Sequence, residues 1–136
     1  MTLVEQLVRD EGEVLRPYRD SRGFLTIGVG HNLDAKPISR RASRVILEDD
    51  IADAVADLHH ALPWAALLDE ARQGVLVNMT FNMGLGGLLT FKKFLAAMQA
   101  GQWPAAAREI LESEYAKQVG ERAKRLAIQT LTGVWA

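Results

Sequence analysis

The sequence predicts an α+β fold that is mostly α-helical, with a small N-terminal β-hairpin lobe, a long connecting helix and a helical C-terminal lobe. Alternating residues around 16–29 are typical of a β-hairpin. About twenty residues from position 39 onward keep the helical period without a break. Residues 62–136 hold several shorter helical segments separated by glycine and proline. A chain of 136 residues is about one domain long, so we expect a single domain, 1–136.

A short helix is predicted at the N-terminus. Four aliphatic residues between positions 3 and 8 recur at helical spacing and form one face. Gly12 can end this helix, because glycine readily adopts the backbone conformations found after helix ends. Glu11 then lies in its last turn.

A β-hairpin is predicted next, with strands at 16–20 and 24–29. Asp20 and Gly23 stand at the first and fourth positions of the connecting turn, which suits a type I turn. Alternation along the second strand separates Thr26 from three aliphatic neighbours. If those neighbours face the core, Thr26 faces outward.

The rest of the chain is predicted to be helical. Ser39 can cap a connecting helix over about 39–61, which Pro63 follows. Such a helix is about 30 Å long, enough to bridge two lobes. Further helices are expected over 67–83, 89–98, from Pro104 onward and over about 121–130. The hairpin lobe is then about 12–38, and the helical lobe combines 1–11 with about 62–136.

Composition excludes several classes of protein. The chain has no Cys, so thiol catalysis is excluded and nothing points to an oxidising compartment. The net charge is −1, with −4 on residues 1–91 and +3 on residues 92–136. Nucleic-acid-binding proteins usually show a basic stripe, which the chain as a whole lacks, so we expect no nucleic-acid partner. The basic C-terminal part either attracts an acidic polymer or forms ordinary solvated helix surfaces.

Three further segments are candidates for a membrane span, a metal site and a signal peptide, and we expect none of these. Residues 73–91 are uncharged over nearly the length of a membrane span, but several glycines favour a buried helix followed by a turn. His59 and His60 are adjacent on a helix and point about 100° apart, so we expect no metal site there. The first twelve residues include acids where a signal peptide needs an apolar core, so we expect synthesis in the cytoplasm.

Three residues near the hairpin can carry acid–base chemistry. The end of a helix favours the neutral form of Glu11, as a general acid requires. Asp20 begins a polar turn and should stay ionised, while Thr26 can hold a water molecule. Each residue also has a purely structural interpretation. Glu11 can be an ordinary surface charge, Asp20 can bond the backbone of its own turn, and Thr26 can be present for its β-propensity.

The segment from Glu11 to His31 closely resembles the phage T4 lysozyme family of endolysins, glycoside hydrolase family 24. It carries the pattern E-x8-D-x5-T and the run T-I-G-V-G-H. The resemblance continues in the same order with N-M-T-F-N-M-G at 78–84, R-A-K-R-L at 122–126 and T-G-V-W at 132–135. These motifs are distributed over most of the chain.

The resemblance implies a two-lobed lysozyme-like fold and a muramidase. Such an enzyme hydrolyses the β-1,4 bond between N-acetylmuramic acid and N-acetylglucosamine in peptidoglycan, without a cofactor and with inversion. Carried over by position, Glu11 is the proton donor, and Asp20 and Thr26 orient and activate the attacking water. Arg122 pairs with the catalytic glutamate, and His31 forms an ion pair with Asp50.

The resemblance also implies a set of substrate-binding residues: Gly30, Asn32, Phe81, Asn82, Phe94 and Gln118. Core packing is the alternative interpretation of Phe81. Three residues on or near the expected groove depart from the T4 enzyme, namely Asn32, Phe94 and Glu109. The segment between His31 and Asp50 is shorter than in that enzyme, and the basic surface typical of the family is weak. These differences indicate an altered substrate range.

The expected biology follows from the resemblance. We expect a monomer without stable membrane insertion that stays in the host cytoplasm until a holin-type protein releases it to the cell wall, whether it comes from a phage or a prophage. A catalytically weak glycan-binding or regulatory module with the same fold is the main alternative, because of the exchanged groove residues. Killing through a membrane-active last helix is a weaker one, since that helix lacks a large apolar face opposite its basic residues.

Overall fold

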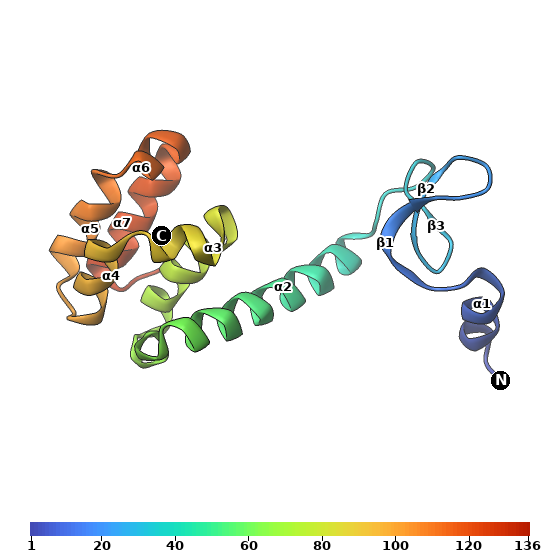
Figure 1. The fold of residues 1–136 in the computed structure, drawn as a ribbon, viewed down its shortest axis with the longest axis horizontal. Coiled ribbons are helices and arrows are strands. Elements are labelled where there is room, and N and C mark those ends of the chain that lie inside the picture. Colours follow the sequence, from blue (N-terminus) through green and yellow to red (C-terminus); the bar gives the residue numbers. More distant parts are fainter. The chain divides into compact units, whose positions relative to one another are not determined.

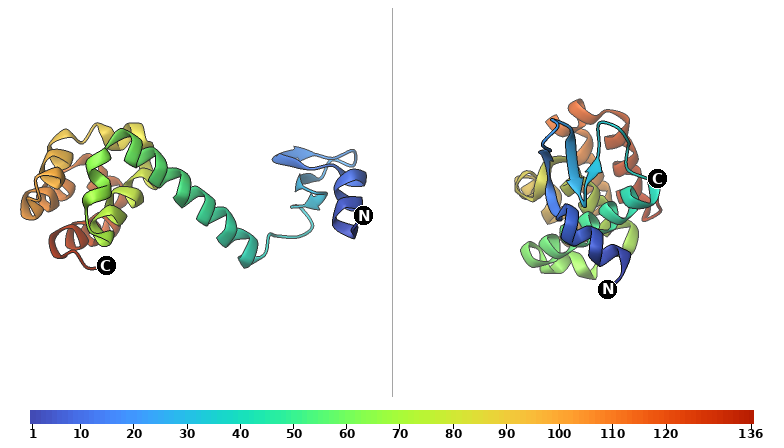
Figure 2. Two further views of the ribbon diagram at one scale, coloured as in Figure 1. Left: turned by 90° about the horizontal axis from the view of Figure 1, so that it is seen from below. Right: turned by 90° about the vertical axis from the view of Figure 1, so that its right-hand side faces the viewer.

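The computed structural model describes all 136 residues, and they divide into two units, Met1–Leu47 and Glu48–Ala136. Figures 1 and 2 show the elements of each unit. The first unit holds one short helix, all the strands and residues 40–47 of α2, and the second holds the rest of α2 and the remaining helices. The predicted α+β class with a predominance of helix is confirmed. The assignment of residues 1–11 to the helical lobe stays a prediction.

Helix α1 (Leu3–Glu11) ends before Gly12, as predicted, and a capping box at Thr2 marks its start. The Thr2 side chain accepts a hydrogen bond from the Glu5 backbone N–H, and the Glu5 side chain accepts one from the Thr2 backbone N–H. This capping box satisfies two of the free N–H groups at the helix start. Gly12 follows the last turn with a φ of 75°. None of the α1 side chains is buried.

Three antiparallel strands follow in the order β1 (Val14–Arg19), β2 (Leu25–Gly28) and β3 (His31–Asn32). The predicted hairpin turn forms, since the Gly23 N–H donates to the Asp20 carbonyl over 2.9 Å. The two residues of β3 are too few to give a period-2 pattern, so this strand could not be predicted.

Because β3 pairs with its free edge, β2 is the central strand of the sheet, and this changes the environment of Thr26. Thr26 lies opposite Tyr18 on one side and Asn32 on the other. Its side chain is only 3% exposed, while Leu25 and Ile27 stay half-buried. The expectation that Thr26 faces outward is therefore wrong: it is the one buried residue of the first unit.

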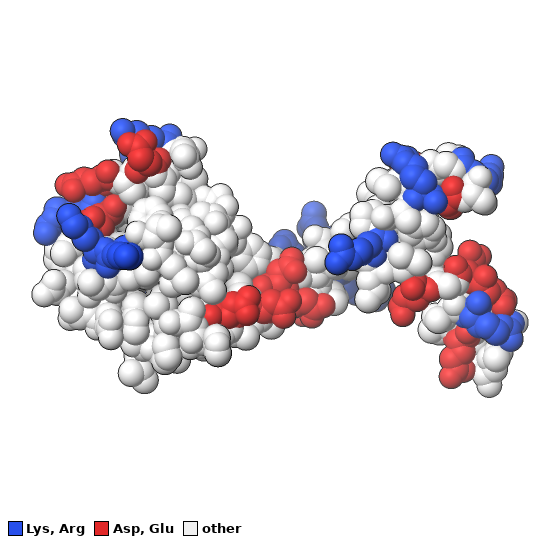
Figure 3. Space-filling model, in the orientation of Figure 1, with Lys and Arg blue, Asp and Glu red and all other residues white.

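Helix α2 (Arg40–Ala61) confirms the predicted connecting helix within one residue. The Ser39 hydroxyl accepts a hydrogen bond from the Ala42 N–H over 3.0 Å, as an N-cap residue does. Leu58 is its one buried residue. Acidic side chains gather along the middle of the helix (Figure 3), where Asp49, Asp53 and Asp57 recur every four residues.

The second unit is built from short helices around one long central helix. After the 3₁₀-helix η1 (Pro63–Leu67) come α3 (Glu70–Leu89), α4 (Lys92–Gln99), α5 (Trp103–Leu111), α6 (Glu114–Val119) and α7 (Glu121–Thr132). Helix α3 is kinked at Gly84, whose φ of 76° and ψ of 162° are not helical. The pair α3 and α4 bends by 105°, and no single helix is long and apolar enough to cross a membrane.

The hydrophobic core lies entirely in the second unit. Its largest fully buried side chains are Leu58, Val75, Leu76, Met79, Leu88, Phe94, Met98 and Ile110. Helix α3 supplies several of them, which confirms its predicted central place. Helix α5 packs against both α4 and α7. Helix α6, of six residues, was not predicted because it is less than two turns long.

Candidate active site

Glu11 lies at the end of α1, and its carboxylate rests against the turn between β2 and β3. A Cβ atom added to Gly30 would lie 3.1 Å from Oε2 of Glu11. Gly30 has a φ of 64°, a conformation that favours glycine. Glycine at this position therefore allows both the turn and the close approach of the carboxylate. Within the first unit the Glu11 side chain is exposed and has no hydrogen-bond or ion-pair partner.

Asp20 follows β1 and is held by its own turn. Its Oδ1 atom accepts hydrogen bonds from the backbone N–H groups of Arg22 and Phe24, each over 2.9 Å. The structural interpretation of this residue is therefore correct, because the carboxylate does bond its own turn. The two bonds occupy only Oδ1, however. The second oxygen, Oδ2, has no partner in the first unit and can accept a hydrogen bond from water.

Thr26 lies in the central strand, and its hydroxyl donates to the carbonyl of Phe24 over 2.9 Å. Its oxygen keeps lone pairs that can accept a hydrogen bond. Asn32 is paired with Thr26 across the sheet, so the two side chains share a face. Oδ1 of Asn32 accepts from the Ala35 N–H over 3.0 Å, which fixes the side chain and leaves its NH₂ group available.

The backbone of Phe24 joins two of the candidate catalytic residues. Its N–H donates to Asp20, and its carbonyl accepts from Thr26. This link was not predicted from the sequence, because a backbone group leaves no residue-type signal. Asp20 and Thr26 are therefore held by one peptide segment of the sheet.

The His31 ring is oriented by a backbone carbonyl of its own unit. Its Nε2 atom lies 3.0 Å from the Lys36 carbonyl, so this nitrogen donates to the backbone. Asp50 lies exposed on α2 in the second unit. The ion pair of His31 with Asp50 stays a prediction.

Arg122 on α7 is anchored to α3 through Asn78. Its Nε donates to Oδ1 of Asn78 over 2.9 Å, and its Nη2 donates to the Asn78 carbonyl over 3.2 Å. Asn78 was not singled out from the sequence, although it opens the N-M-T-F-N-M-G motif. Asn82 lies four residues further along α3 and therefore on the same helix face. The pairing of Arg122 with Glu11 stays a prediction.

Phe81, Asn82 and Gln118 are exposed in the second unit. The Phe81 side chain is 44% exposed, so core packing does not explain it. Tyr115, on the same helix as Gln118, is buried with a hydroxyl that has no hydrogen-bond partner. Burial raises the pKa of the Tyr115 hydroxyl, and the nearby Arg122 charge opposes that shift.

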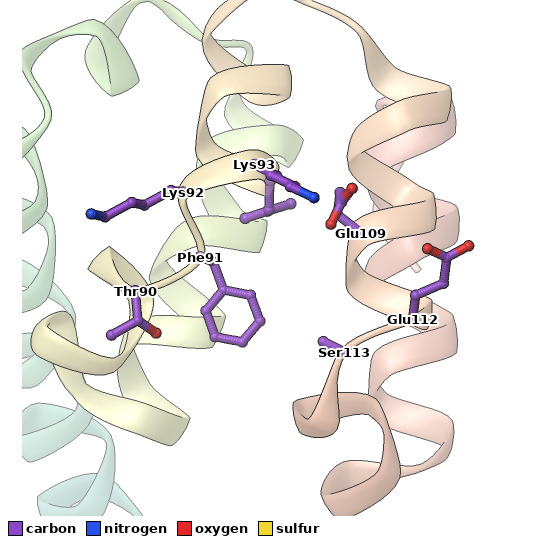
Figure 4. Close-up of a pocket in the computed structure, with 8 residues that line it drawn as sticks. Thr90, Phe91, Lys92, Lys93, Glu109, Glu112 and Ser113 are labelled. Atoms are coloured by element: carbon purple, nitrogen blue, oxygen red, sulfur yellow. The ribbon is translucent and has the colours of Figure 1, made fainter.

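Phe94, another expected groove residue, contributes to a pocket of about 390 Å³ in the second unit (Figure 4). Its side chain is 1% exposed, so most of the ring belongs to the core. The other lining residues are Thr90, Phe91, Lys92, Lys93, Glu109, Glu112 and Ser113. Phe94 and Glu109, both expected on or near the substrate groove, thus meet in this pocket.

The histidines and acids form no metal centre. No group of three or more His, Cys, Asp or Glu side chains is placed to hold an ion. Nε2 of His59 lies 3.0 Å from Oε1 of Gln73, a bond that joins α2 to α3.

Comparison with known proteins gives relatives over nearly the whole chain. A family model described as phage lysozyme matches residues 8–129. The pre-baseplate central spike protein Gp5 of Enterobacteria phage T4 is 33% identical over an alignment 162 positions long, which covers 98% of this chain and 28% of that protein. The probable T4-type lysozyme 1 of Dictyostelium discoideum is 27% identical over an alignment 161 positions long. This alignment covers 97% of this chain and 95% of that protein. The endolysin of Salmonella phage P22 is 33% identical over 92 residues, covering 60% of each.

Proposed function

Because the chain belongs to the phage lysozyme family, we propose that it hydrolyses peptidoglycan at the β-1,4 bond between N-acetylmuramic acid and N-acetylglucosamine. The observation that carries the proposal is the different hydrogen bonding of two carboxyl groups in the first unit. Glu11 has no partner there, and Asp20 is held through one oxygen only. The names lysozyme and endolysin among the relatives support the same chemistry, although the chain spans only 28% of the spike protein's length.

The proposed roles follow from these surroundings. Glu11 gives its proton to the glycosidic oxygen as the bond to the anomeric carbon breaks. A water molecule held by Oδ2 of Asp20 and by the Thr26 hydroxyl attacks that carbon from the opposite face. Asp20 accepts the proton that the water loses, so the product has the inverted configuration.

The remaining predicted residues are kept as part of the proposal. Gly30, beside Glu11, and Asn32, beside Thr26, are the proposed substrate-binding residues of the first unit. The proposed sugar-binding residues of the second unit are Phe81, Asn82, Phe94 and Gln118. Arg122, His31 and Asp50 are proposed to support the site through ion pairs. We further propose a monomer that reaches the cell wall from the host cytoplasm through holin-type release.

The test is release of reducing ends from purified peptidoglycan by wild type and Glu11→Gln. The variant keeps the shape of the side chain but has no carboxyl proton, so the rate should fall about 100- to 10,000-fold. The rate of Asp20→Asn should fall similarly, because an amide cannot accept the proton of the attacking water. The turn should stay intact, since the Oδ1 atom of asparagine can still accept both backbone hydrogen bonds. Glu13→Gln, at a neighbouring exposed glutamate, is the matched control and should keep the wild-type rate. Circular dichroism checks that all four proteins are folded.

The outcomes separate the alternatives. Equal release by wild type and Glu11→Gln would mean that another group is the acid. Glycan binding without release by any folded protein would favour the binding module over the enzyme. The stereochemistry is read by NMR from the first anomer formed: the α-anomer supports inversion, and the β-anomer contradicts it.

A further inference from the structure

One face of the small sheet carries both groups proposed to hold the attacking water, and it carries one amide beside them. The register pairs Tyr18 with Thr26 and Thr26 with Asn32. The ladder continues to Asp20, whose N–H donates to the Phe24 carbonyl over 2.9 Å. Because residues two apart along a strand point to the same face, Asp20 lies on the face of Tyr18. Asp20, Thr26 and Asn32 therefore share one face of the sheet.

Asn32 is a close neighbour of Thr26 on this face. The Leu33 N–H donates to the Leu25 carbonyl over 2.8 Å, so the pair of Thr26 and Asn32 lies between backbone hydrogen bonds and makes none itself. In such antiparallel pairs the Cα atoms are about 4.5 Å apart, and the side chains are closer than in hydrogen-bonded pairs. The Asn32 side chain is therefore within reach of a water molecule bound at the Thr26 hydroxyl.

The Asn32 amide is held so that it offers donors only. The Ala35 N–H donates to Oδ1 over 3.0 Å, and since a backbone N–H needs an acceptor, this bond distinguishes the oxygen from the nitrogen of the amide. The Lys36 N–H donates to the Asn32 carbonyl over 3.0 Å, so the turn fixes the backbone as well. The NH₂ group has no partner in the first unit and keeps two free N–H donors.

A water molecule held for attack needs a donor of this kind. The Thr26 hydroxyl gives its proton to the Phe24 carbonyl, so it can only accept a hydrogen bond from the water. The Asp20 carboxylate also only accepts. Both protons of the water are then engaged, and its two lone pairs remain. One lone pair attacks the anomeric carbon, and a donor bound to the other fixes the direction of the first, because an ordered water makes about three hydrogen bonds.

We propose that the Asn32 NH₂ group donates a hydrogen bond to the attacking water and is the third group that holds it, with Asp20 and Thr26. The proposal rests on the proposed hydrolysis of peptidoglycan. Asn32 exchanges no proton: the water still loses its proton to Asp20, and Glu11 still protonates the leaving oxygen. In this role Asn32 contacts the nucleophile and not the sugar.

The test measures kcat and KM separately on soluble glycan strands of peptidoglycan. Asn32→Asp keeps the shape of the side chain and the acceptor for the Ala35 N–H, and Asn32→Ser is neutral and can accept the same bond through its hydroxyl. Both variants lack the NH₂ group. Each should lower kcat about tenfold, the order of one lost hydrogen bond, and leave KM unchanged. Tyr18→Phe, which removes the other side-chain donor of this row, is the matched control and should keep the wild-type kcat.

A second measurement follows binding without turnover, in Glu11→Gln protein. Adding Asn32→Ser should leave the Kd for the uncleaved strands unchanged, because a residue that holds only the water does not contact the sugar. A Kd weakened about tenfold, or a raised KM with an unchanged kcat, would assign Asn32 to the sugar and overturn the proposal.

The remaining outcomes are also decisive. A wild-type kcat in both folded Asn32 variants, or a loss of kcat in Tyr18→Phe instead, would overturn the role of Asn32 and leave the proposed function intact. No release of reducing ends by wild type would overturn the proposed function and this role together. Circular dichroism checks that each variant is folded.

Discussion

At the scale of single residues, small contacts decide what the candidate acid can do. The exposed carboxylate of Glu11 can lie close to Gly30 because nothing larger than a hydrogen atom projects from that residue. Asp20 and Thr26 are held by the N–H and the carbonyl of one residue, Phe24. One of the two candidate carboxyl groups thus stays unbonded, while the other is held in place by backbone N–H groups.

Gly30→Ala should lower activity by about 10- to 100-fold, because the new methyl group would push the Glu11 carboxylate away from its position. The same change should cost about 1 kcal/mol of stability, since the φ of 64° suits glycine. Reducing-end release and urea unfolding measure the two effects.

Gly28→Ala is the control for that experiment. Gly28 has a similar φ of 68° at the same turn, but a Cβ atom there meets no other atom within 4 Å. It should lose similar stability and keep its activity. Equal loss of activity in both variants would show that turn strain, and not contact with Glu11, is responsible.

At the scale of the elements, the second unit is held together by contacts between its first and last long helices. Gln129 on α7 donates to the Ala71 carbonyl on α3 over 2.7 Å. Arg72 donates to the carbonyls of Thr130 and Leu131 and stacks on the Trp103 ring at 3.9 Å. The T-G-V-W motif ends beside α3, since the Trp135 ring occupies the space where Gly74 has no side chain.

Gly74→Ala should therefore destabilise the protein by about 1–3 kcal/mol, although alanine is the better helix former. The new methyl group would meet the Trp135 ring and approach the Gln129 amide to 3.2 Å. Thermal and urea unfolding, followed by tryptophan fluorescence, measure the change.

Gly86→Ala is the matched control on the same helix. A Cβ atom at Gly86 meets nothing within 4 Å, so this variant should gain about 0.5–1 kcal/mol from helix propensity alone. Stabilisation by both substitutions would contradict the proposed contact between Trp135 and α3.

At the scale of the whole molecule, burial is distributed very unevenly. Every buried hydrophobic side chain lies at or after Leu58, and Thr26 is the one buried residue of the first unit. The three candidate catalytic residues all belong to that first unit. The part of the molecule proposed to do the chemistry therefore has little core of its own.

Hydrogen exchange should report this difference directly. Amides of β1 and β2 should exchange at least about tenfold faster than those of α3, α5 and α7, because local opening costs less where few apolar groups are buried. Mass spectrometry of peptic peptides measures it. Equal protection in both units would show that the first unit unfolds only together with the second.

Much of the molecule could be predicted from local signals. Ser39 before α2, Gly12 after α1 and Pro104 at the start of α5 are each sufficient to locate a helix end, because caps act through neighbouring residues. The candidate catalytic set of Glu11, Asp20 and Thr26 came from a local motif that resembles a known family, and it stays a prediction. The helix ends depend on residues close in sequence, and the sequence by itself determined them.

Other features were decided only by the tertiary structure. Thr26 is buried because the two-residue strand β3 pairs with β2, and the pocket beside Phe94 exists because the start of α4 meets the end of α5. Asn78 has its role through Arg122, 44 residues away. Burial and pocket formation arise between segments distant along the chain, and no local pattern of residues records which segments will meet.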